Sequence, residues 1–380
     1  MKMTKSLYVI IIFIALIVFS GCSKKELNYT VSEVDGIKTY FNKNIPSDPN
    51  FKISPKELFT IDFSENNPDS SLRYINFGNL CADKEKNIYL VDYMKCKVTK
   101  VDSLGKFVTS FGKKGTGPGE MNEPYNIAVM SDTLYVFDYT ERKTNIFDLD
   151  GNFIKADFIA SNAFFYHISG VNDEKFTGIL ALDRYGDQGV YTVYQIPIYT
   201  KNSLPYKELY NREEILQPPN DRFWPANYQP PYAVGKDKIY VMENSTDKYS
   251  ILVFNFNGEL QYKIRKNYMR LKVTDLDIED TYLGKTDYKN INTYKNAANV
   301  FGLHATKDGY LLVQASIERT PENRFDYIVD AFKDGVYINS FKMEIGKAFD
   351  IVYTGHNRWF IGDRIYYKNR DDNYLSVYEY

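Results

Sequence analysis

Short apolar runs separated by polar turns recur along most of the chain, and two pairs of them share one register. Ile88–Asp92 (IYLVD) is echoed by Leu134–Asp138 (LYVFD), and Val101–Phe107 (VDSLGKF) is echoed by Phe147–Phe153 (FDLDGNF). Both echoes are offset by about 46 residues, a spacing typical of repeat proteins. Short runs of β-branched and aromatic residues bounded by Gly, Asp and Asn predict β-strands. The pattern therefore indicates a repeated unit built from strands.

Less regular copies of this unit follow further along the chain. Their apolar runs lie at Lys238–Val241, Asp308–Val313 and Asp363–Tyr367, and a degenerate copy is expected between Phe164 and Tyr199. With the two copies that share a register, the chain contains six units.

The second unit shows how each unit divides into strands. From inside to outside, the predicted strands are Asn126–Val129, Thr133–Asp138, Thr144–Leu149 and Asn152–Ala156. Asp150-Gly151 supplies the last tight turn, because glycine accepts a positive φ without steric cost. Six four-stranded antiparallel units predict an all-β fold, a six-bladed β-propeller.

A further strand, Leu58–Phe63, precedes the first unit. We expect this N-terminal strand to join the C-terminal blade and close the ring, because closure removes exposed sheet edges. No stretch after residue 60 has long helical periodicity. The polar stretch Thr274–Asn299 is expected to hold a short helix or a long loop.

The first residues have the pattern of an export signal. Lys2 and Lys5 precede an unbroken apolar run, Leu7–Phe19, which is short for a membrane span and right for a signal peptide. Phe19-Ser20-Gly21-Cys22 resembles a bacterial lipobox, with Phe19 in place of the usual leucine. Residues 1–21 are then a lipoprotein signal peptide, and Cys22 carries the lipid. The alternative is an ordinary signal peptide with an incidental cysteine.

After the signal peptide, residues 22–55 are expected to be a tether and lead-in, and residues 56–380 are expected to form the propeller. Lipid on Cys22 would make the membrane a partner. A serine after the cysteine, here Ser23, is typical of lipoproteins of the outer membrane. The sequence does not determine whether the protein lies on the periplasmic or the surface face of that membrane. The other cysteines, Cys81 and Cys96, fall on strands that are not neighbours and are expected to be buried free thiols.

Composition supports strands and disfavours one class of partner. The chain has 34 Tyr and 25 Phe but only 2 Trp, and aromatic residues favour pleated, half-buried surfaces. The formal net charge is -2 and no basic stripe is present, so nucleic-acid binding has little support.

Three alternating glycines, Gly115, Gly117 and Gly119, suggest a phosphate-binding loop at first sight. Such a loop needs a following helix whose N-terminal amides complete the site. Here Pro124 and a β-like run follow, without a Gly-Lys-Ser/Thr sequence. We therefore interpret the stretch as the joint between blades one and two.

Gly115–Val129 resembles the start of an NHL repeat, as does the pairing of a Leu-Tyr-Val strand with a Phe-Asp-x-Asp-Gly turn. With the lipobox and Gly36–Tyr40, the chain resembles the six-bladed β-propeller lipoproteins of Bacteroidetes over nearly its full length. The resemblance implies a propeller in the cell envelope and assigns no biochemical role.

Candidates for catalysis are few. The histidines are His167, His304 and His356, and none belongs to a nucleophile motif. His167 and His304 are expected near inner strands, where they either converge on the channel as in metal-dependent propeller lyases or pack as core residues. Some six-bladed propellers are calcium-dependent lactonases, for which Asn126 and Asn76 are candidate oxygen ligands.

Asp92 and Asp138, which end two predicted strands, are expected to bond the backbone of nearby turns instead of a metal. No catalytic residue and no resident metal or other cofactor is therefore assigned, and calcium belongs to the enzyme alternative alone.

The strongest candidate for a binding site is the loop Gln217–Tyr232, which leads into the inner strand of blade four. Trp224 and Tyr228 can stack on a sugar ring, and Arg222 can hold a carboxylate or hydroxyl. The alternative is that these side chains pack the loop against itself. Neighbouring blade loops add further candidates to this rim, namely Tyr93, Lys95, Tyr139 and Arg142.

These features favour a lipid-anchored envelope propeller that acts as a non-enzymatic binding or scaffold module for a glycan or a protein partner. The rival is a hydrolase or lyase that uses a divalent cation at the central channel.

Overall fold

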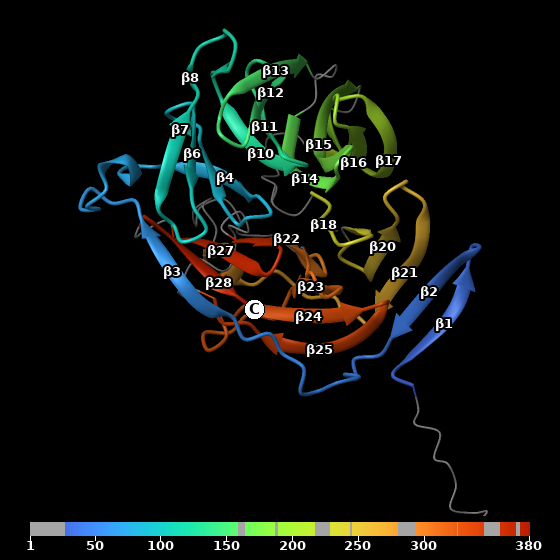
Figure 1. Cartoon of the computed structure of the whole chain (residues 1–380). Coiled ribbons are helices and arrows are strands. Elements are labelled where there is room, and N and C mark those ends of the chain that lie inside the picture. Colours follow the sequence, from blue (N-terminus) through green and yellow to red (C-terminus); the bar gives the residue numbers. More distant parts are fainter. Residues whose placement is uncertain are drawn as a thin grey trace, which may run out of the picture.

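The computed structural model describes residues 27–158, 164–186, 189–216, 229–243, 245–279, 294–324, 326–345, 358–369 and 373–380. In this part of the chain, six sheets stand around a common centre (Figure 1). Each contains four antiparallel strands in the order expected of a blade. The predicted all-β, six-bladed propeller is confirmed.

The first three blades follow one another along the chain. Blade one contains β4 (Phe77–Ala82), β5 (Ile88–Asp92), β6 (Lys97–Val101) and β7 (Phe107–Phe111). Blade two contains β10 (Pro124–Met130), β11 (Thr133–Asp138), β12 (Lys143–Asp148) and β13 (Phe153–Phe158). Blade three contains β14 (Phe164–Asn172), β15 (Lys175–Gly186), β16 (Gly189–Thr200) and β17 (Pro205–Leu216).

The other three blades complete the ring. Blade four contains β18 (Tyr232–Val234), β19 (Ile239–Met242), β20 (Tyr249–Phe254) and β21 (Leu260–Lys266). Blade five contains β22 (Ala298–Ala305), β23 (Tyr310–Ala315), β24 (Ile328–Lys333) and β25 (Val336–Lys342). Blade six contains β26 (Arg358–Ile361), β27 (Arg364–Asn369), β28 (Tyr374–Glu379) and β3 (Lys56–Asp62).

Burial explains why the second strand of a blade is an unbroken apolar run. All positions of β5 and of β19 are buried, because neighbouring blades cover both faces of these strands. The outer strand β7 instead alternates between half-buried and exposed positions, since one of its faces meets water. A 3-10 turn, η1 (Ser70–Leu72), precedes blade one.

The turn at Gly151 serves both the strand and the contact between blades. Asp148 Oδ1 accepts hydrogen bonds from the backbone N–H groups of Asp150 at 3.0 Å and Asn152 at 2.8 Å. Gly151 has φ +90°, and a Cβ there would collide with the ring of Phe111 in blade one. The predicted turn is confirmed, and glycine is required for packing as well as for backbone conformation.

The N-terminal strand β3 closes the ring. It pairs antiparallel with β28, with Ile61 opposite Leu375 and Phe59 opposite Val377. Ile61 and Leu375 are both buried in the seam. The sequence-based prediction of closure through this strand is confirmed.

An additional hairpin lies within the segment expected to be a tether. β1 (Tyr29–Val34) and β2 (Ile37–Asn42) form it, and β2 pairs in parallel with β21 at the outer edge of blade four (Figure 1). Asn42 secures it, because its side chain donates to Gly335 O at 2.9 Å and accepts from Tyr337 N at 2.8 Å in blade five. The sequence did not predict this docking.

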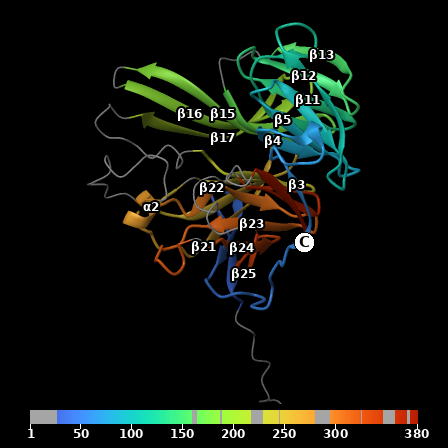
Figure 2. The same ribbon diagram turned by 90° about the vertical axis from the view of Figure 1, so that its left-hand side faces the viewer.

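Blade three corrects the expectation of a degenerate unit ending near Tyr199. The unit is a complete blade and continues to Leu216, with strands of twelve residues in β15, β16 and β17. These strands project beyond the rest of the disc (Figure 2). The outer strand was missed because its sequence, PYKELYNREEIL, is polar and mostly exposed.

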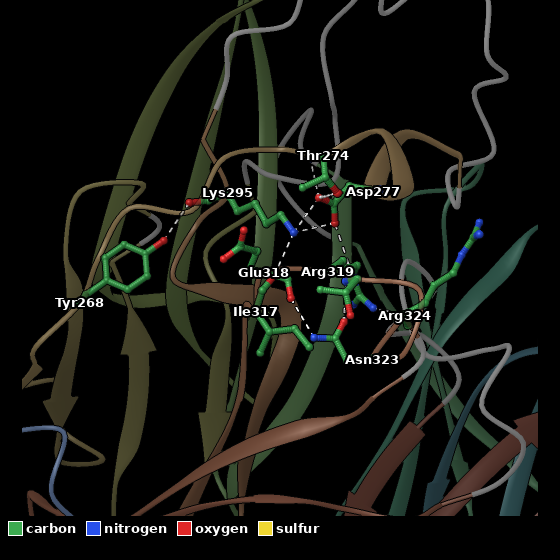
Figure 3. Close-up of polar contacts among 10 residues, drawn as sticks. Tyr268, Thr274, Asp277, Lys295, Ile317, Glu318, Arg319, Asn323 and Arg324 are labelled. Atoms are coloured by element: carbon green, nitrogen blue, oxygen red, sulfur yellow. Dashed lines mark hydrogen bonds and ion pairs between the residues drawn. The ribbon is translucent and has the colours of Figure 1, made fainter.

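The stretch Thr274–Asn299 contains the short helix α2 (Asp275–Glu279), as one of the two expectations had it. Asp277 is buried and holds Lys295 Nζ at 2.6 Å and Thr274 Oγ1 at 2.7 Å, while Arg319 Nε lies 3.4 Å away (Figure 3). Burial lowers the pKa of Lys295, and the ion pair with Asp277 opposes that shift. This closed network is structural.

No helix in the described part of the chain is long and apolar enough to cross a membrane.

Replacing Leu375 with alanine should lower the free energy of unfolding by about 2–5 kcal/mol, because the change opens a cavity in the closing seam. The control Leu104→Ala, at a side chain that is 65% exposed, should change it by less than about 0.5 kcal/mol. Equilibrium unfolding in urea measures both. Equal effects would contradict the role assigned to the seam.

Candidate functional site

The glycine-rich stretch is a joint between blades and is filled by its own glutamate. It forms a parallel ribbon of β8 (Lys113–Lys114) and β9 (Glu120–Met121) between β7 and β10. Glu120 accepts from Gly117 N at 2.9 Å and pairs with Lys113 Nζ at 2.9 Å. The hydrogen bond from Lys113, followed by the one from the Gly117 N–H, lowers the pKa of Glu120. The interpretation as a joint is confirmed, and the loop leaves no cradle for a phosphate.

A cavity of about 370 Å³ occupies the centre of the propeller. The inner strands of all six blades contribute to its wall, and none of the described residues that line it is Asp or Glu. Its polar side chains come from five of these strands: Asn79, His167, Ser169, Tyr232, His304, Arg358 and Trp359. Inner strands thus bring together residues from distant parts of the sequence.

A relay of hydrogen bonds runs around part of this wall and joins four consecutive blades. Trp359 Nε1 donates to Asn79 Oδ1 at 2.7 Å, and Asn79 Nδ2 donates to Asn126 Oδ1 at 2.8 Å. Asn126 Nδ2 then donates to Phe165 O at 2.7 Å. The oxygen of Asn126, a candidate calcium ligand, is therefore already engaged.

The remaining acidic and amide candidates serve the turns. Asn76 precedes β4, and its backbone N–H donates to Asp92 at 3.1 Å. Asp92 also accepts from the N–H groups of Met94 and Lys95, and Asp138 accepts from those of Asn122, Glu123 and Glu141. The expectation that these aspartates bond nearby backbone is confirmed. Among the described residues, no three His, Cys, Asp or Glu side chains form a group that could hold a metal ion.

Two of the three histidines line the cavity. His304 stacks on Phe360, with ring centroids 4.0 Å apart, and its Nε2 lies 3.4 Å from Tyr327 Oη. Burial, with a contribution from the charge of Arg358, lowers the pKa of His304 to about 3. His304 is therefore neutral at physiological pH although part of its ring faces the cavity. His167 lies on β14, and His356 lies outside the described residues.

Arg358 is the charged side chain of the cavity wall. It is 5% exposed, and its guanidinium lies over the rings of Tyr327 at 4.8 Å and Tyr367 at 5.1 Å. Burial raises the pKa of Tyr327 to about 12, so that this phenol stays neutral. Sequence analysis missed Arg358 and Trp359. Their signal was an adjacent Arg-Trp pair shortly before the Asp363–Tyr367 run, where the unit repeat places an inner strand.

The predicted rim residues lie apart from the cavity. Tyr93 is half-buried beside Gly78, and Tyr139 is 51% exposed. Arg142 is exposed in the turn between β11 and β12, and Lys95 Nζ donates to Tyr74 O at 2.7 Å. None of these four lines the cavity.

The other site predictions are not tested. Arg222, Trp224 and Tyr228 lie outside the described residues, as does Cys22.

The two remaining cysteines are free and buried, as expected. Cys81 contributes to the cavity wall, and burial raises the pKa of its thiol. A neutral, enclosed thiol is a poor nucleophile, so Cys81 is a packing residue.

Between pH 6.5 and 5, His304 alone should reduce the free energy of unfolding by on the order of 2 kcal/mol. Its folded-state pKa of about 3 lies below the ordinary value of 6.5, so only the unfolded chain takes up the proton in this range. The stabilisation is complete above pH 6.5 and is lost as the pH falls towards 3. Urea unfolding at several pH values in this range should show that the free energy of unfolding of His304→Gln depends less steeply on pH than that of the unaltered protein. An identical slope in both proteins would contradict the buried, neutral state of His304.

Comparisons with known proteins find one matching family model and several similar solved structures. Residues 68–193 match a family model described as a 6-bladed beta-propeller, whereas no curated protein matches the chain. Virginiamycin B lyase from Staphylococcus aureus is 11% identical, with 85% of this chain and 98% of that chain covered and a TM-score of 0.42. A protein of Bacteroides fragilis described as exported is 10% identical, with 90% and 98% covered and a TM-score of 0.49. A streptogramin B lyase is 10% identical, with 79% and 78% covered and a TM-score of 0.37.

Similarity at this level of identity concerns the fold alone. The six four-stranded blades and the family match over residues 68–193 lead to one conclusion. The chain is a six-bladed β-propeller protein.

Proposed function

We propose that this protein is a lipid-anchored binding module of the bacterial cell envelope, and that its ligand occupies the central channel. The observation that carries the proposal is the cavity of about 370 Å³ with polar side chains from five inner strands. Ligand pockets in proteins commonly have volumes of roughly 300–1,000 Å³ and combine apolar walls with a few placed polar groups. The cavity has both properties.

Hydrogen bonds hold several polar side chains in and beside the wall in place before a ligand enters. Asn79, Asn126 and Trp359 are held by the hydrogen-bond relay, and Tyr232 Oη lies 3.1 Å from Ser169 Oγ. A site held on packed strands loses little conformational entropy when a ligand enters. These contacts favour a rigid receptor for a small polar molecule, such as a sugar released from a glycan.

The rival function, a hydrolase or lyase that uses a divalent cation, is less well supported. Calcium and magnesium require several oxygen ligands, usually including carboxylates. The cavity-lining residues within the described ranges include no carboxylate, and the oxygens of Asn79 and Asn126 accept hydrogen bonds from neighbouring side chains. The donor set suits an uncharged or anionic ligand better than a cation.

The loop face remains a second location for a glycan or an envelope protein. Arg222, Trp224 and Tyr228 belong to the connection between β17 and β18, and β18 contributes Tyr232 to the cavity wall. Trp, Tyr and Arg are the residue types that most often dominate binding energy at interfaces. A protein partner would contact this face, whereas a small ligand would enter the channel.

The proposed lipid anchor would hold the propeller near the membrane. About six residues separate Cys22 from Tyr29 at the start of β1, so that even a fully extended chain spans only about 20–25 Å. The hairpin of β1 and β2 lies at the outer edge of blade four, and this edge would face the lipid. Several acyl chains on one cysteine anchor firmly, since each buried methylene contributes about 0.8 kcal/mol.

Thermal shifts of the chain from Ser23 onward, measured with envelope and dietary glycans, their monosaccharides, calcium and EDTA, would test the binding function. A ligand at about 100 times its dissociation constant should add about 2.7 kcal/mol of stability. Ser169→Phe, which fills the channel, should abolish the shift, and the control Ser32→Phe on exposed β1 should keep it. Loss of the shift in Trp224→Ala alone would relocate the site to the loop, and a calcium shift reversed by EDTA would favour the enzyme.

Cys22→Ser should move the protein from the membrane fraction to the soluble fraction of cells, because it removes the proposed acylation site. Cys81→Ala, at a buried thiol, should leave the protein in the membrane fraction. Fractionation followed by immunoblotting measures both. Membrane association of the Cys22→Ser protein would show that another feature holds it there.

A further inference from the structure

Arg358 carries a buried positive charge with unused hydrogen-bond donors. Its Nε and Nη2 are enclosed, and neither has a hydrogen-bond partner among the residues that the structure describes. No carboxylate in the described part of the chain forms an ion pair with it. The rings of Tyr327 and Tyr367 stabilise a cation through their faces, but they do not satisfy the N–H groups.

Two other buried cations, Lys266 and Lys295, are paired with acids, whereas buried Arg364 donates to the backbone oxygen of Ser103. Lys266 Nζ lies 2.8 Å from the carboxylate of Asp330 and also over the ring of Tyr337 at 4.3 Å. Lys295 is paired with Asp277. Burying a charge without a partner is strongly unfavourable, so an anion that pairs with Arg358 would offset this cost.

The surroundings of Arg358 are complementary to an anion. In the part of the chain that the structure describes, no carboxylate lines the cavity and would repel one. His304 lies beside Arg358 as a neutral imidazole, and a neutral imidazole carries one N–H that can donate a hydrogen bond. Ser169 and Tyr232 supply hydroxyl groups on the opposite part of the ring of strands.

We infer that the central channel binds a small hydroxylated carboxylate, such as an acidic monosaccharide, with Arg358 as its counter-ion. The inference rests on the channel being the binding site proposed above. Nε and Nη2 form one edge of the guanidinium, and this edge matches the two oxygens of a carboxylate. Arg358 lines the cavity, and its side chain would have to turn this edge from its enclosed position towards the ligand.

Calorimetric titration with glucuronate and galacturonate, with glucose and galactose as uncharged controls, tests this inference. The uronates should bind at least about 10-fold more tightly than the neutral sugars. Arg358→Met should weaken uronate binding at least about 30-fold, because it removes the counter-ion. Arg358→Lys keeps the charge and loses the planar edge, so its affinity for uronates should lie between those of the unaltered protein and Arg358→Met. Arg364→Met removes a buried arginine of the same blade outside the cavity and should leave binding unchanged.

Melting without ligand provides an independent readout. Arg358→Met should melt at or above the temperature of the unaltered protein, because it removes an unpaired buried charge. A large decrease would identify Arg358 as one half of a structural pair and would overturn the inference.

The remaining outcomes separate the inference from the proposed function. Equal binding of uronates and neutral sugars, abolished by Ser169→Phe, would overturn the carboxylate and preserve the channel as a binding site. If inorganic phosphate binds more tightly than the uronates and its binding depends on Arg358, the ligand of the channel carries a phosphate group and the inference of a carboxylate is overturned. No binding of uronates, acetate or phosphate at tens of millimolar would overturn the inference.

Discussion

The pairing of β3 with β28 is the constraint on which the rest of the structure depends. It joins residues 56–62 to residues 374–379, so the two ends of the propeller sequence meet in one blade. Without it, blade six lacks its outer strand and the ring has free sheet edges. The buried side chains of Ile61 and Leu375 stabilise this seam, and Thr60 Oγ1 meets Ser376 Oγ at 2.8 Å across it.

A closed ring fixes the inner strands at a common distance from the axis, and this distance creates the channel. The relay from Trp359 through Asn79 and Asn126 to Phe165 O spans blades six, one, two and three. Its first bond crosses from the last blade to the first, so it forms only in a closed ring. Closure at the rim and the shape of the central cavity are thus physically coupled.

The buried cations of the interior differ in their partners. Asp277 neutralises Lys295 (Figure 3), and Asp330 neutralises Lys266 between blades four and five. Arg358 instead lies between aromatic rings at the wall of the channel, beside a histidine that remains neutral. Among its described residues, this wall presents Arg358 with several N–H and O–H donors and no acid, a set of groups that can hold a polar or anionic ligand.

The sequence by itself determined the strands, the turns and the closed ring. An apolar run such as Ile88–Asp92 has to be buried on both faces. In blade two, Asp150-Gly151 specifies the turn between β12 and β13 through local backbone sterics. Polar segments were predicted less well, since the exposed outer strand β17 and the hairpin of β1 and β2 have weak local signals. Only the tertiary structure brought Asn79, His304 and Arg358 to one cavity, because residues from different blades meet there through ring geometry and not through spacing along the chain. A loop rich in Trp and Tyr is visible in a sequence, whereas a buried arginine without a partner becomes visible only when its neighbours are known.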